Sequence, residues 1–527
     1  MSLDSEGASG TRDPIRNLSG EVRVASRIID YLSSGLYATP GACLKELVNN
    51  SYDADASYAR LSVKPSAYTV TLEDDGVGMT AAKFEAHFRK IADSRKRDTS
   101  HQTERGRKKI GKIGIGFIAA NELCNQMRIE STVHGSTELL DVTVDFQAMR
   151  DDPADRRDED GTLHKGDYDG HVFETDIERQ FTRVTLSDLT SDAQNALIRA
   201  EREEHQPKKP ETLYGLRPDS VRDVLGRLRT WSDLDLYSQT MAQVGLNVPV
   251  SYPGHWLASN LDKRSKKVEE VEADFTKRAD DLGFTVVYDG TDLRKPVVLP
   301  AQRQACLVRT ISYKGENVSY HGYLFASHGT IAPTELQGVL LRVKEAAIGG
   351  YSQDLLGFPQ SRFSLLQRWV SGEIYASDEL EEAMNIDRST LRETHPAFVE
   401  LRRTFHDELA GFLSEAREVL YKQPSDRRRK REAKEASERI VDRLRAPREG
   451  SGTEMQETSS EYEPAAHAVQ ERADSDPSSF TRKLTTAELF ELVTEVADEI
   501  LPPAHAGRFL EALANSIFRR GRSGRSE

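Results

Sequence analysis

Residues 46–54 read Glu-Leu-Val-Asn-Asn-Ser-Tyr-Asp-Ala, and this stretch gives the first indication of the fold. If it is helical, Glu46, Asn50 and Asp53 follow one another at intervals of four and three residues. At about 100° per residue they then project within roughly 60° of one another. Residues 42–53 are therefore predicted to form a helix with one apolar face and one face that holds two carboxylates and an amide. An ordinary amphipathic helix is the alternative explanation of this pattern.

Two strands are predicted at 60–63 and 69–74, and a turn that contains two glycines follows the second of them. Residues 74–79 read Asp-Asp-Gly-Val-Gly-Met, directly after a strand predicted at 69–74. Gly76 and Gly78 allow the backbone to approach a flat ligand closely. Asp74, at the end of the strand, can accept a hydrogen bond from an exocyclic amine. A simple turn without a ligand would show the same residues.

A third segment, residues 111–117, reads Gly-Lys-Ile-Gly-Ile-Gly-Phe at the predicted start of a helix over 115–124. Glycine amides at a helix N-terminus form a site for anions. The neighbouring run Gly106 to Lys112 has the spacing of a P-loop. However, Ile113 stands where a P-loop needs a hydroxyl, and no strand precedes the run, which excludes a P-loop.

These three segments together resemble the motifs of the GHKL ATPases, the superfamily of DNA gyrase, the ninety-kilodalton heat-shock chaperones, histidine kinases and MutL. ELVNNSYDADA looks like the family's N-box, DDGVGM like its first glycine box and GKIGIGF like its second. The resemblance covers about residues 21–395. It implies an α/β fold, in which a Bergerat-type two-layer ATPase sandwich is followed by an α/β transducer domain and a helical C-terminal tail.

Within the superfamily, heat-shock chaperones of the HtpG type are the nearer resemblance, with MutL-like and microrchidia-like relatives second. Residues 368–391 resemble the chaperone segment that ends in Leu-Asn-Ile-Ser-Arg-Glu, here Met-Asn-Ile-Asp-Arg-Ser over 384–389. Arg388 thus matches an arginine that reaches the γ-phosphate across a domain interface. Alternatively, Arg388 is a surface residue that caps a helix near Ser389. Lys344 is a weaker second candidate, because other subfamilies use a transducer lysine.

The resemblance implies ATP and Mg²⁺ as cofactors and gives each motif residue a role. Glu46 would orient the attacking water as a general base, which favours ATP hydrolysis over phosphotransfer to histidine. Asn50 would bind Mg²⁺ as an oxygen donor, and Arg388 would stabilise charge that develops in phosphoryl transfer. Asp74 would bind the adenine amine, and Thr185 would help to hold that aspartate. The remaining residues expected around the nucleotide are Asp53, Gly76, Gly78, Met79, Gly111, Gly114, Gly116 and Phe117.

Residues 95–112 take the place of the family's ATP lid. Between Lys83 and Lys112 there are eleven Lys and Arg residues against four Asp and Glu residues. This excess of positive charge indicates either a solvated loop or a cationic cover for a triphosphate. In the second case, Ser94 and Lys96 resemble the lid serine and lysine of MutL-like relatives.

The composition of the chain excludes several classes of protein. The chain has 527 residues and a net charge of −14, so several domains are expected and a protein that coats nucleic acid along its whole surface is disfavoured. The N-terminus has no secretory signal, and no apolar run is long enough to cross a bilayer. Three Cys residues lie far apart without a CxxC motif, which excludes a zinc finger and fits a reducing cytoplasm. We therefore expect a cytoplasmic protein without a membrane segment.

Shifts in composition predict the domain boundaries. The expected order is a disordered N-terminus (1–20), the ATP-binding domain (21–192), the transducer or middle domain (193–395), a helical segment (396–445), a flexible linker (446–480) and a C-terminal helical segment (481–520). The linker is rich in Ser, Glu, Pro and Gly, and Pro502-Pro503 divides the last segment into two amphipathic helices. Residues 147–170 form an acidic insertion that has no counterpart in the resemblance.

Two functions remain open. The first is a chaperone-like machine in which ATP drives lid closure and homodimerisation, acting on a protein client or partner subunit. The second is a MutL-like or microrchidia-like ATPase clamp that acts on DNA, in a role such as genome defence. Its support is the segment 427–445, with nine basic and four acidic residues. An exposed basic helix explains that segment equally well.

Overall fold

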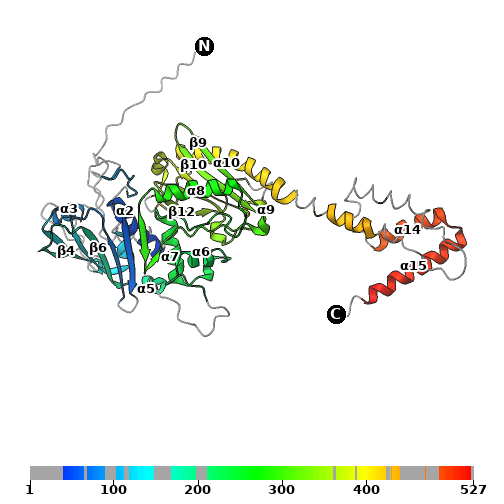
Figure 1. The fold of residues 1–527 in the computed structure, drawn as a ribbon, viewed down its shortest axis with the longest axis horizontal. Coiled ribbons are helices and arrows are strands. Elements are labelled where there is room, and N and C mark those ends of the chain that lie inside the picture. The colour runs from blue at the N-terminus through cyan, green and yellow to red at the C-terminus, as the bar shows by residue number, and fades with distance from the viewer. Residues whose placement is uncertain are drawn as a thin grey trace, which may run out of the picture. The chain divides into compact units, whose positions relative to one another are not determined.

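The computed structural model describes most of the chain in two compact units, residues 1–417 and 418–527 (Figure 1). The described residues are 39–64, 68–88, 102–111, 118–147, 168–197, 210–359, 364–385, 388–422, 428, 430–439, 469 and 486–523. None of the helices in these ranges is long and apolar enough to cross a membrane.

The first unit contains an eight-stranded sheet with the strand order β5-β4-β3-β6-β2-β1-β7-β8. Helices, including α2, α5 and α7, cover it on one side (Figure 1). This arrangement confirms the predicted α/β class. The strands are β1 (Tyr58–Lys64), β2 (Thr69–Asp74), β3 (Cys124–Thr132), β4 (Glu138–Asp145), β5 (Tyr168–Glu174), β6 (Phe181–Leu189), β7 (Thr285–Tyr288) and β8 (Thr291–Asp292). The helices of this region are α2 (Pro40–Asp53), α3 (Ala81–Phe88), α5 (Ser191–Leu197), α6 (Pro218–Leu225), α7 (Leu236–Asn247) and α8 (Lys266–Asp280), with 3-10 turns η3 (Ile118–Glu122) and η4 (Trp231–Asp233).

Helix α2 begins where the sequence provides a capping residue. The Thr39 side chain accepts a hydrogen bond from the Ala42 amide, and Pro40 occupies the first turn, where its missing N–H costs nothing. Leu44 and Val48 are fully buried. Gly41 lies against α7, and a Cβ there would stand 2.6 Å from the side-chain oxygen of Gln243. The two helices therefore approach closely, and α2 presents its other side to the candidate site.

The first sheet takes strands from both halves of the expected domain division. β7 pairs in parallel with β1, with Tyr58 opposite Thr285, although 285–288 fall in the expected second domain. The expected boundary near residue 192 is therefore not an edge of this sheet. α7 also packs on both α2 and α5. Residues after 192 thus complete the first layer before the second sheet begins.

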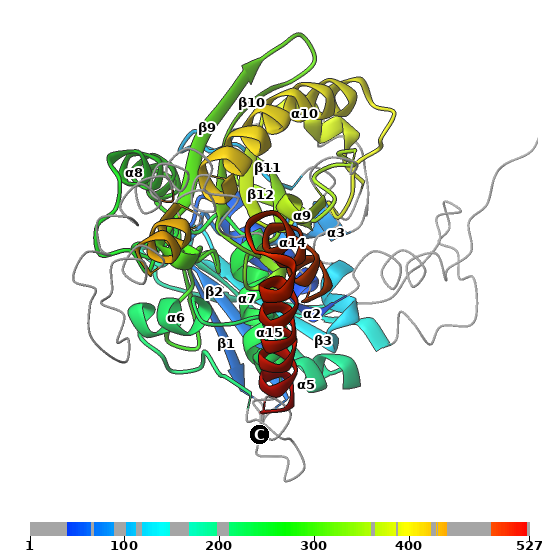
Figure 2. The ribbon, with the colours of Figure 1, turned by 90° about the vertical axis from the view of Figure 1, so that its right-hand side faces the viewer.

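A five-stranded sheet follows, with the order β12-β11-β13-β10-β9. In both ribbon views, α10 runs beside β9 and β10, on which it packs (Figures 1 and 2). The elements of this region are β9 (Cys306–Lys314), β10 (Ser319–Ser327), β11 (Gly338–Val343), β12 (Ala346–Ser352), β13 (Val370–Ala376), α9 (Ser364–Gln367), α10 (Pro396–Ala416), the 3-10 turns η5 (Gln302–Gln304), η6 (Thr334–Leu336) and η7 (Asp378–Ala383), and the π-helical turn η8 (Arg417–Lys422). The sequence pattern predicts strands near 305–313, 319–326 and 338–343, which β9, β10 and β11 confirm, but it does not predict β12 or β13.

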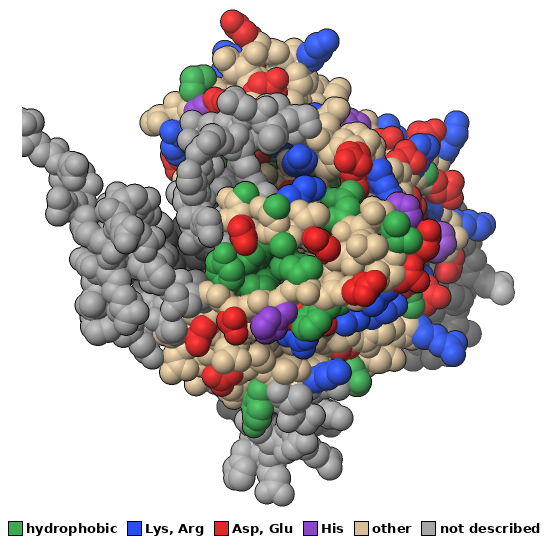
Figure 3. Space-filling view, turned by 90° about the vertical axis from the view of Figure 1, so that its left-hand side faces the viewer, with side chains coloured by type: hydrophobic (Ala, Val, Ile, Leu, Met, Phe, Trp, Pro, Cys, Tyr) green, Lys and Arg blue, Asp and Glu red, His purple; other side chains and the backbone are tan. Residues whose placement is uncertain are grey.

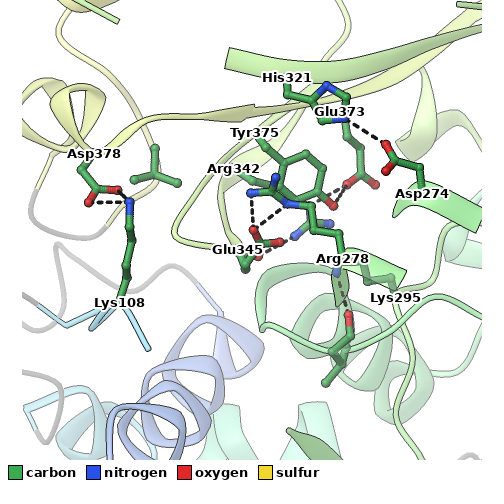
Figure 4. Close-up of polar contacts among 12 residues, drawn as sticks. Lys108, Asp274, Arg278, Lys295, His321, Arg342, Glu345, Glu373, Tyr375 and Asp378 are labelled. Atoms are coloured by element: carbon green, nitrogen blue, oxygen red, sulfur yellow. Dashed lines mark hydrogen bonds and ion pairs between the residues drawn. The ribbon is translucent and has the colours of Figure 1, made fainter. Parts of the chain in front are cut away.

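A buried polar network joins the second sheet to the helix layer of the first (Figure 4). Arg342 and Glu373 are fully buried and form an ion pair at 2.6 Å. Arg342 also donates to the carbonyl of Leu246 near the end of α7, at 2.8 Å. Glu373 accepts hydrogen bonds from three tyrosine hydroxyls: Tyr252, Tyr351 and Tyr375. Removing one member of such a pair is strongly destabilising, so the network holds the second sheet in place against α7.

The opposite end of the first sheet is more open. β5 is an edge strand whose residues are all exposed, and Val172 and Phe173 are each 49% exposed. The space-filling view from the side of α3 and β4 has hydrophobic side chains gathered among charged ones (Figure 3). Most of the acidic insertion expected at 147–170 lies outside the described residues.

In its described part, the second unit contains the helical residues 430–439 and the helices α14 (Thr486–Ile500) and α15 (Pro503–Ser523), and α14 and α15 pack on each other. They are separated at Pro502-Pro503, as the sequence indicated. The linker expected at 446–480 falls outside the described residues, apart from Val469, which is helical.

Candidate active site

The buried carboxylate of Asp74 lies at the end of β2, beneath α2. Val70, Leu72 and Asp74 alternate with half-buried residues, so all three face the core. The Ser51 hydroxyl of α2 donates to Asp74 Oδ2 at 2.6 Å, and the Gly76 amide donates to Oδ1 at 2.9 Å. Burial raises the pKa of Asp74 to about 6. Each carboxylate oxygen can accept a further hydrogen bond, so Asp74 can still bind a donor from a ligand.

The strand register decides which threonine lies beside Asp74. β6 pairs antiparallel with β2, and Thr182 stands opposite Asp74. Directly opposed residues share a face of the sheet. Thr185, the residue expected from the sequence, is opposite Thr71 and points to the other face. The structure therefore does not bring Thr185 to Asp74. Thr182 takes that position, with its hydroxyl 2.9 Å from the hydroxyl of Ser131.

The turn after β2 is held by close backbone contacts. The Val77 amide donates to the carbonyl of Ala54 at 2.8 Å, and the Met79 amide donates to the Ser131 hydroxyl at 2.8 Å. Gly78 has φ +73°, and a Cβ there would lie 2.1 Å from the carbonyl of Thr132. This position therefore requires glycine. A Cβ on Gly76 would lie 2.8 Å from the carbonyl of Ala54. Gly76 thus lets the turn fold tightly against the end of α2, and Gly78 lets it fold against the end of β3.

The polar face of α2 forms the second part of the site. Asn50 is exposed, and the Glu46 side chain is 15% exposed. Asp53, one turn further along, accepts hydrogen bonds from the amides of Ile110 and Gly111, both at 2.7 Å. Asp53 therefore holds the start of the segment that was expected to bind phosphate.

The surroundings of Asp53 shift its pKa in two opposite directions. Burial raises its pKa to about 6, while the two amides and the nearby cations Arg388 and Lys344 lower it. Both Asp53 and Asp74 therefore change charge near pH 6, well above the ordinary range of an aspartate. Raised carboxylate pKa values in one place are typical of a functional site, although ion-pair networks can produce them too.

Arg388 reaches the same place from the segment between η7 and α10. Its guanidinium donates to the carbonyl of Ile110 at 2.7 Å and to that of Val343 at 3.2 Å. Arg388 is buried and has φ +56°, an uncommon backbone conformation for a non-glycine residue. Burial lowers its pKa, and Glu381, Glu46 and Asp53 act in the opposite direction. It is therefore not an exposed helix cap.

Residues 102–111, the described part of the expected lid, are anchored on several sides. Arg107 donates to the carbonyl of Ala56 at 2.6 Å, and the Arg105 amide donates to Asp55 at 3.0 Å. Lys108 pairs with Asp378 of η7 at 3.0 Å (Figure 4). Five expected site residues lie outside the described residues: Ser94, Lys96, Gly114, Gly116 and Phe117. The helix predicted over 115–124 is wrong at its end, because 118–122 form a 3-10 turn and β3 begins at Cys124.

Three residues of the site were not singled out from the sequence: Ser51, Thr182 and Glu381. Ser51 was visible as the only residue of α2 with a short hydroxyl side chain on the turn between Asn50 and Asp53. Thr182 was visible from the alternation of Val184 and Leu186 on β6. Glu381 had no local signal, since it lies in an acidic run of η7.

The comparisons with known proteins agree with this geometry. Residues 38–158, which include α2, β1 to β4 and the glycine turn, match the family described as "Histidine kinase-, DNA gyrase B-, and HSP90-like ATPase". Residues 38–158 thus match a GHKL-type ATPase domain.

Individual relatives of the GHKL domain are distant. "Chaperone protein HtpG" of Bacillus licheniformis is 28% identical over 134 residues, covering 22% of this chain and 21% of that protein. HtpG of Bacillus subtilis matches at the same identity and coverage. "Putative type II restriction enzyme HgiDII" of Herpetosiphon aurantiacus is 29% identical over 115 residues, covering 22% of this chain and 18% of that protein. The chain thus spans about a fifth of the length of these relatives.

The residues of the GHKL domain fit ATP and Mg²⁺. A buried carboxylate with free lone pairs at Asp74 suits the amine of adenine. Mg²⁺ in nucleotide sites is commonly held by one or two protein oxygens together with phosphates and waters. The exposed amide of Asn50, one turn from Glu46 and Asp53, supplies such an oxygen.

Proposed function

We propose that this protein binds and hydrolyses ATP with Mg²⁺ and uses the reaction as a chaperone-like conformational machine. The observation that carries the proposal is the buried Asp74, bonded to Gly76 and to Ser51 on the buried side of α2, in the region that matches a GHKL domain. Few other purposes explain a carboxylate with spare acceptor capacity in that place. The relatives named HtpG chaperones support the chaperone-like reading.

In this proposal, the chain's own side chains divide the work. Bound MgATP supplies the phosphoanhydride bond. Asp74 binds the adenine amine, Ser51 orients Asp74, and Thr182 lies opposite Asp74 in the sheet. The turn at Gly76, Gly78 and Met79 lines the base.

The phosphate end of the proposed site is supplied by α2, the segment that includes Gly111 and the segment between η7 and α10 that carries Arg388. Asn50 binds Mg²⁺, and Glu46 takes a proton from the attacking water. Asp53 positions Gly111, the first residue of the second glycine segment. The other residues proposed to close over the phosphates are Gly114, Gly116 and Phe117 of that segment and Ser94 and Lys96 of the lid region. Arg388 places a guanidinium beside Ile110, next to that segment.

The wider organisation follows the same proposal. Residues 21–192 with the strands β7 and β8 form the nucleotide unit, and the second sheet, up to about residue 395, acts as transducer. Lid closure and homodimerisation would accompany ATP binding, in the cytoplasm, and a protein client or partner subunit would be the object of the motion. Binding energy that differs between open and closed states is what drives such a change.

Asp74→Asn tests the nucleotide site. The variant replaces a charged acceptor with an amide that can direct a donor at the adenine amine. Since a hydrogen bond to a charged group contributes about 1.5–3 kcal/mol, we expect the Kd for ATP to rise about 10–150-fold. Calorimetry with ATP measures it. Asp141→Asn is the matched control, because Asp141 lies on β4 of the same sheet, paired with Arg128. Unchanged affinity in Asp74→Asn would place the nucleotide elsewhere.

A DNA-acting clamp is the second candidate, favoured by the relative named as a type II restriction enzyme. The basic segment 427–445 would be the contact. In its described part, Arg428, Arg431 and Lys434 each pair with a glutamate four residues on, so some of the charge is already compensated. ATPase rates with and without duplex DNA at two salt concentrations separate the two candidates. Stimulation that disappears with salt supports the clamp, because phosphate contacts are strongly salt-dependent. A rate that does not respond to DNA supports the chaperone-like function.

A further inference from the structure

Two cations of the second sheet region meet at one carboxylate, that of Glu381 in η7. Lys344 donates to Glu381 Oε2 at 2.8 Å, and Arg388 Nη1 lies 3.9 Å from Glu381 Oε1. The side chains are 5%, 9% and 9% exposed for Lys344, Arg388 and Glu381. One negative charge therefore faces two positive charges in a nearly dry setting, where such interactions are strong.

The arrangement leaves hydrogen-bonding capacity unused. Within the part of the chain that the structure describes, Glu381 Oε1 and Arg388 Nε are buried without a hydrogen-bond partner. Buried polar atoms without partners are costly, and they are rare in folded proteins. At 3.9 Å, Arg388 and Glu381 attract each other but do not form a hydrogen bond. The Glu381 carboxylate therefore forms a hydrogen bond with Lys344 but not with Arg388.

The backbone holds both cations in place. Lys344 and Glu345 form the turn between β11 and β12, with φ +52° and +67°. Arg278 binds Glu345 and fixes that turn. Arg388 is held through its carbonyl, which accepts a hydrogen bond from the Gly349 amide at 3.0 Å. Non-glycine residues at positive φ persist only where the surroundings enforce them, and they gather at functional sites.

Arg388 stands next to Ile110, directly before Gly111, the described start of the segment expected to bind phosphate. The same Nη1 of Arg388 that faces Glu381 donates to the carbonyl of Ile110. The amides of Ile110 and Gly111 are held by Asp53. A terminal phosphate that reaches Gly111 would thus lie near Arg388.

We infer that Glu381 is a positioning residue that competes with the terminal phosphate of a nucleoside triphosphate for Lys344 and Arg388. This inference rests on the proposed function. A terminal phosphate offers more negative charge and three acceptor oxygens, so it can bond to both cations where the carboxylate bonds to one. Glu381 keeps the two cations together and oriented, and it gives them up when the phosphate arrives. Displacing Glu381 therefore weakens the binding of nucleoside triphosphates. It does not affect nucleoside diphosphates, which lack the terminal phosphate.

Glu381→Gln tests the competition, because it keeps the shape and removes the charge. We measure the Kd values of ATPγS and ADP by calorimetry on the full chain. The expected result is a roughly 5–30-fold gain in ATPγS affinity, in the range of ordinary coupling between sites, with ADP affinity unchanged. Glu382→Gln, the exposed neighbour on η7, is the matched control and should change neither value. Equal changes for ATPγS and ADP, or a loss of ATPγS affinity in a folded Glu381→Gln, would overturn the inference.

Two further variants keep the test decisive. If Glu381→Gln does not fold, Glu381→Asp retains the charge but shortens its reach, and it should still raise ATPγS affinity relative to ADP; no rise overturns the inference. Lys344→Met should reduce the preference for ATPγS over ADP, and an unchanged preference would also overturn it. If the wild-type protein binds neither nucleotide, the proposed function itself has failed, which is a different outcome from a wild-type protein that binds both while Glu381→Gln alters neither.

Discussion

Replacing Glu46 with alanine is expected to abolish most ATP turnover while leaving ATP binding in place. Glu46 lies on the polar face of α2, one turn before Asn50, with a side chain that is 15% exposed. A group in that position can reach water and still be sheltered enough to act as a base. Loss of a positioned general base typically costs about 10²–10⁴ in rate. Single-turnover hydrolysis and ATP calorimetry on the same variant measure the two effects.

The separation of the two effects follows from what Glu46 touches. In the proposed mechanism the base contacts water and not the nucleotide, so the Kd for ATP should change little. Glu46→Gln should be nearly as slow as Glu46→Ala, because it keeps the size but cannot take a proton. Glu85→Ala, on the exposed side of α3, is the control for a lost carboxylate. A wild-type rate in Glu46→Ala would remove Glu46 from the mechanism.

Local patterns were sufficient for the first half of the site. The helix around Glu46 and the strand before Asp74 follow from spacing and alternation over a few residues, and both are present as α2 and β2. The choice of Thr185 as the residue beside Asp74 was wrong, because the alternation along β6 was not taken into account. Val184 and Leu186 alternate inward on β6, so Thr182 shares their face and Thr185 does not. Period-two alternation, applied to this strand, would have given the threonine that lies opposite Asp74.

Contacts between residues far apart in the sequence could not be predicted from local sequence patterns. β7 pairs with β1 across more than two hundred residues, as the partners Tyr58 and Thr285 show, and no periodicity within either strand specifies that partner. The same holds for Glu381, whose meaning depends on Lys344 and Arg388 arriving from other parts of the chain. The resemblance supplied Arg388, but the sequence suggested a separate domain that docks later. The structure instead brings Arg388 into hydrogen-bond contact with Ile110 within one compact unit.

Arg388→Ala is expected to lower kcat far more than it weakens ATP binding. The guanidinium stands beside Ile110, at the start of the phosphate segment, and is held there by the carbonyls of Ile110 and Val343. A fixed cation there would act mainly on charge that develops as the phosphoryl group transfers. Loss of such an arginine can cost as much as about 10³–10⁵ in rate. A machine whose rate is limited by closure would show a smaller loss.

Lysine and a neighbouring arginine provide the controls for Arg388. Arg388→Lys should recover only part of the rate, because lysine keeps the charge but not the planar fork that bonds two oxygens. Arg392→Ala removes an exposed arginine four residues along, and should leave kcat unchanged. Because Arg388→Ala also leaves Glu381 with one cation fewer, thermal melting must confirm that the variant is folded. A folded Arg388→Ala with normal kcat would show that this guanidinium only anchors the Ile110 segment, and would leave Lys344 as the cation of the site.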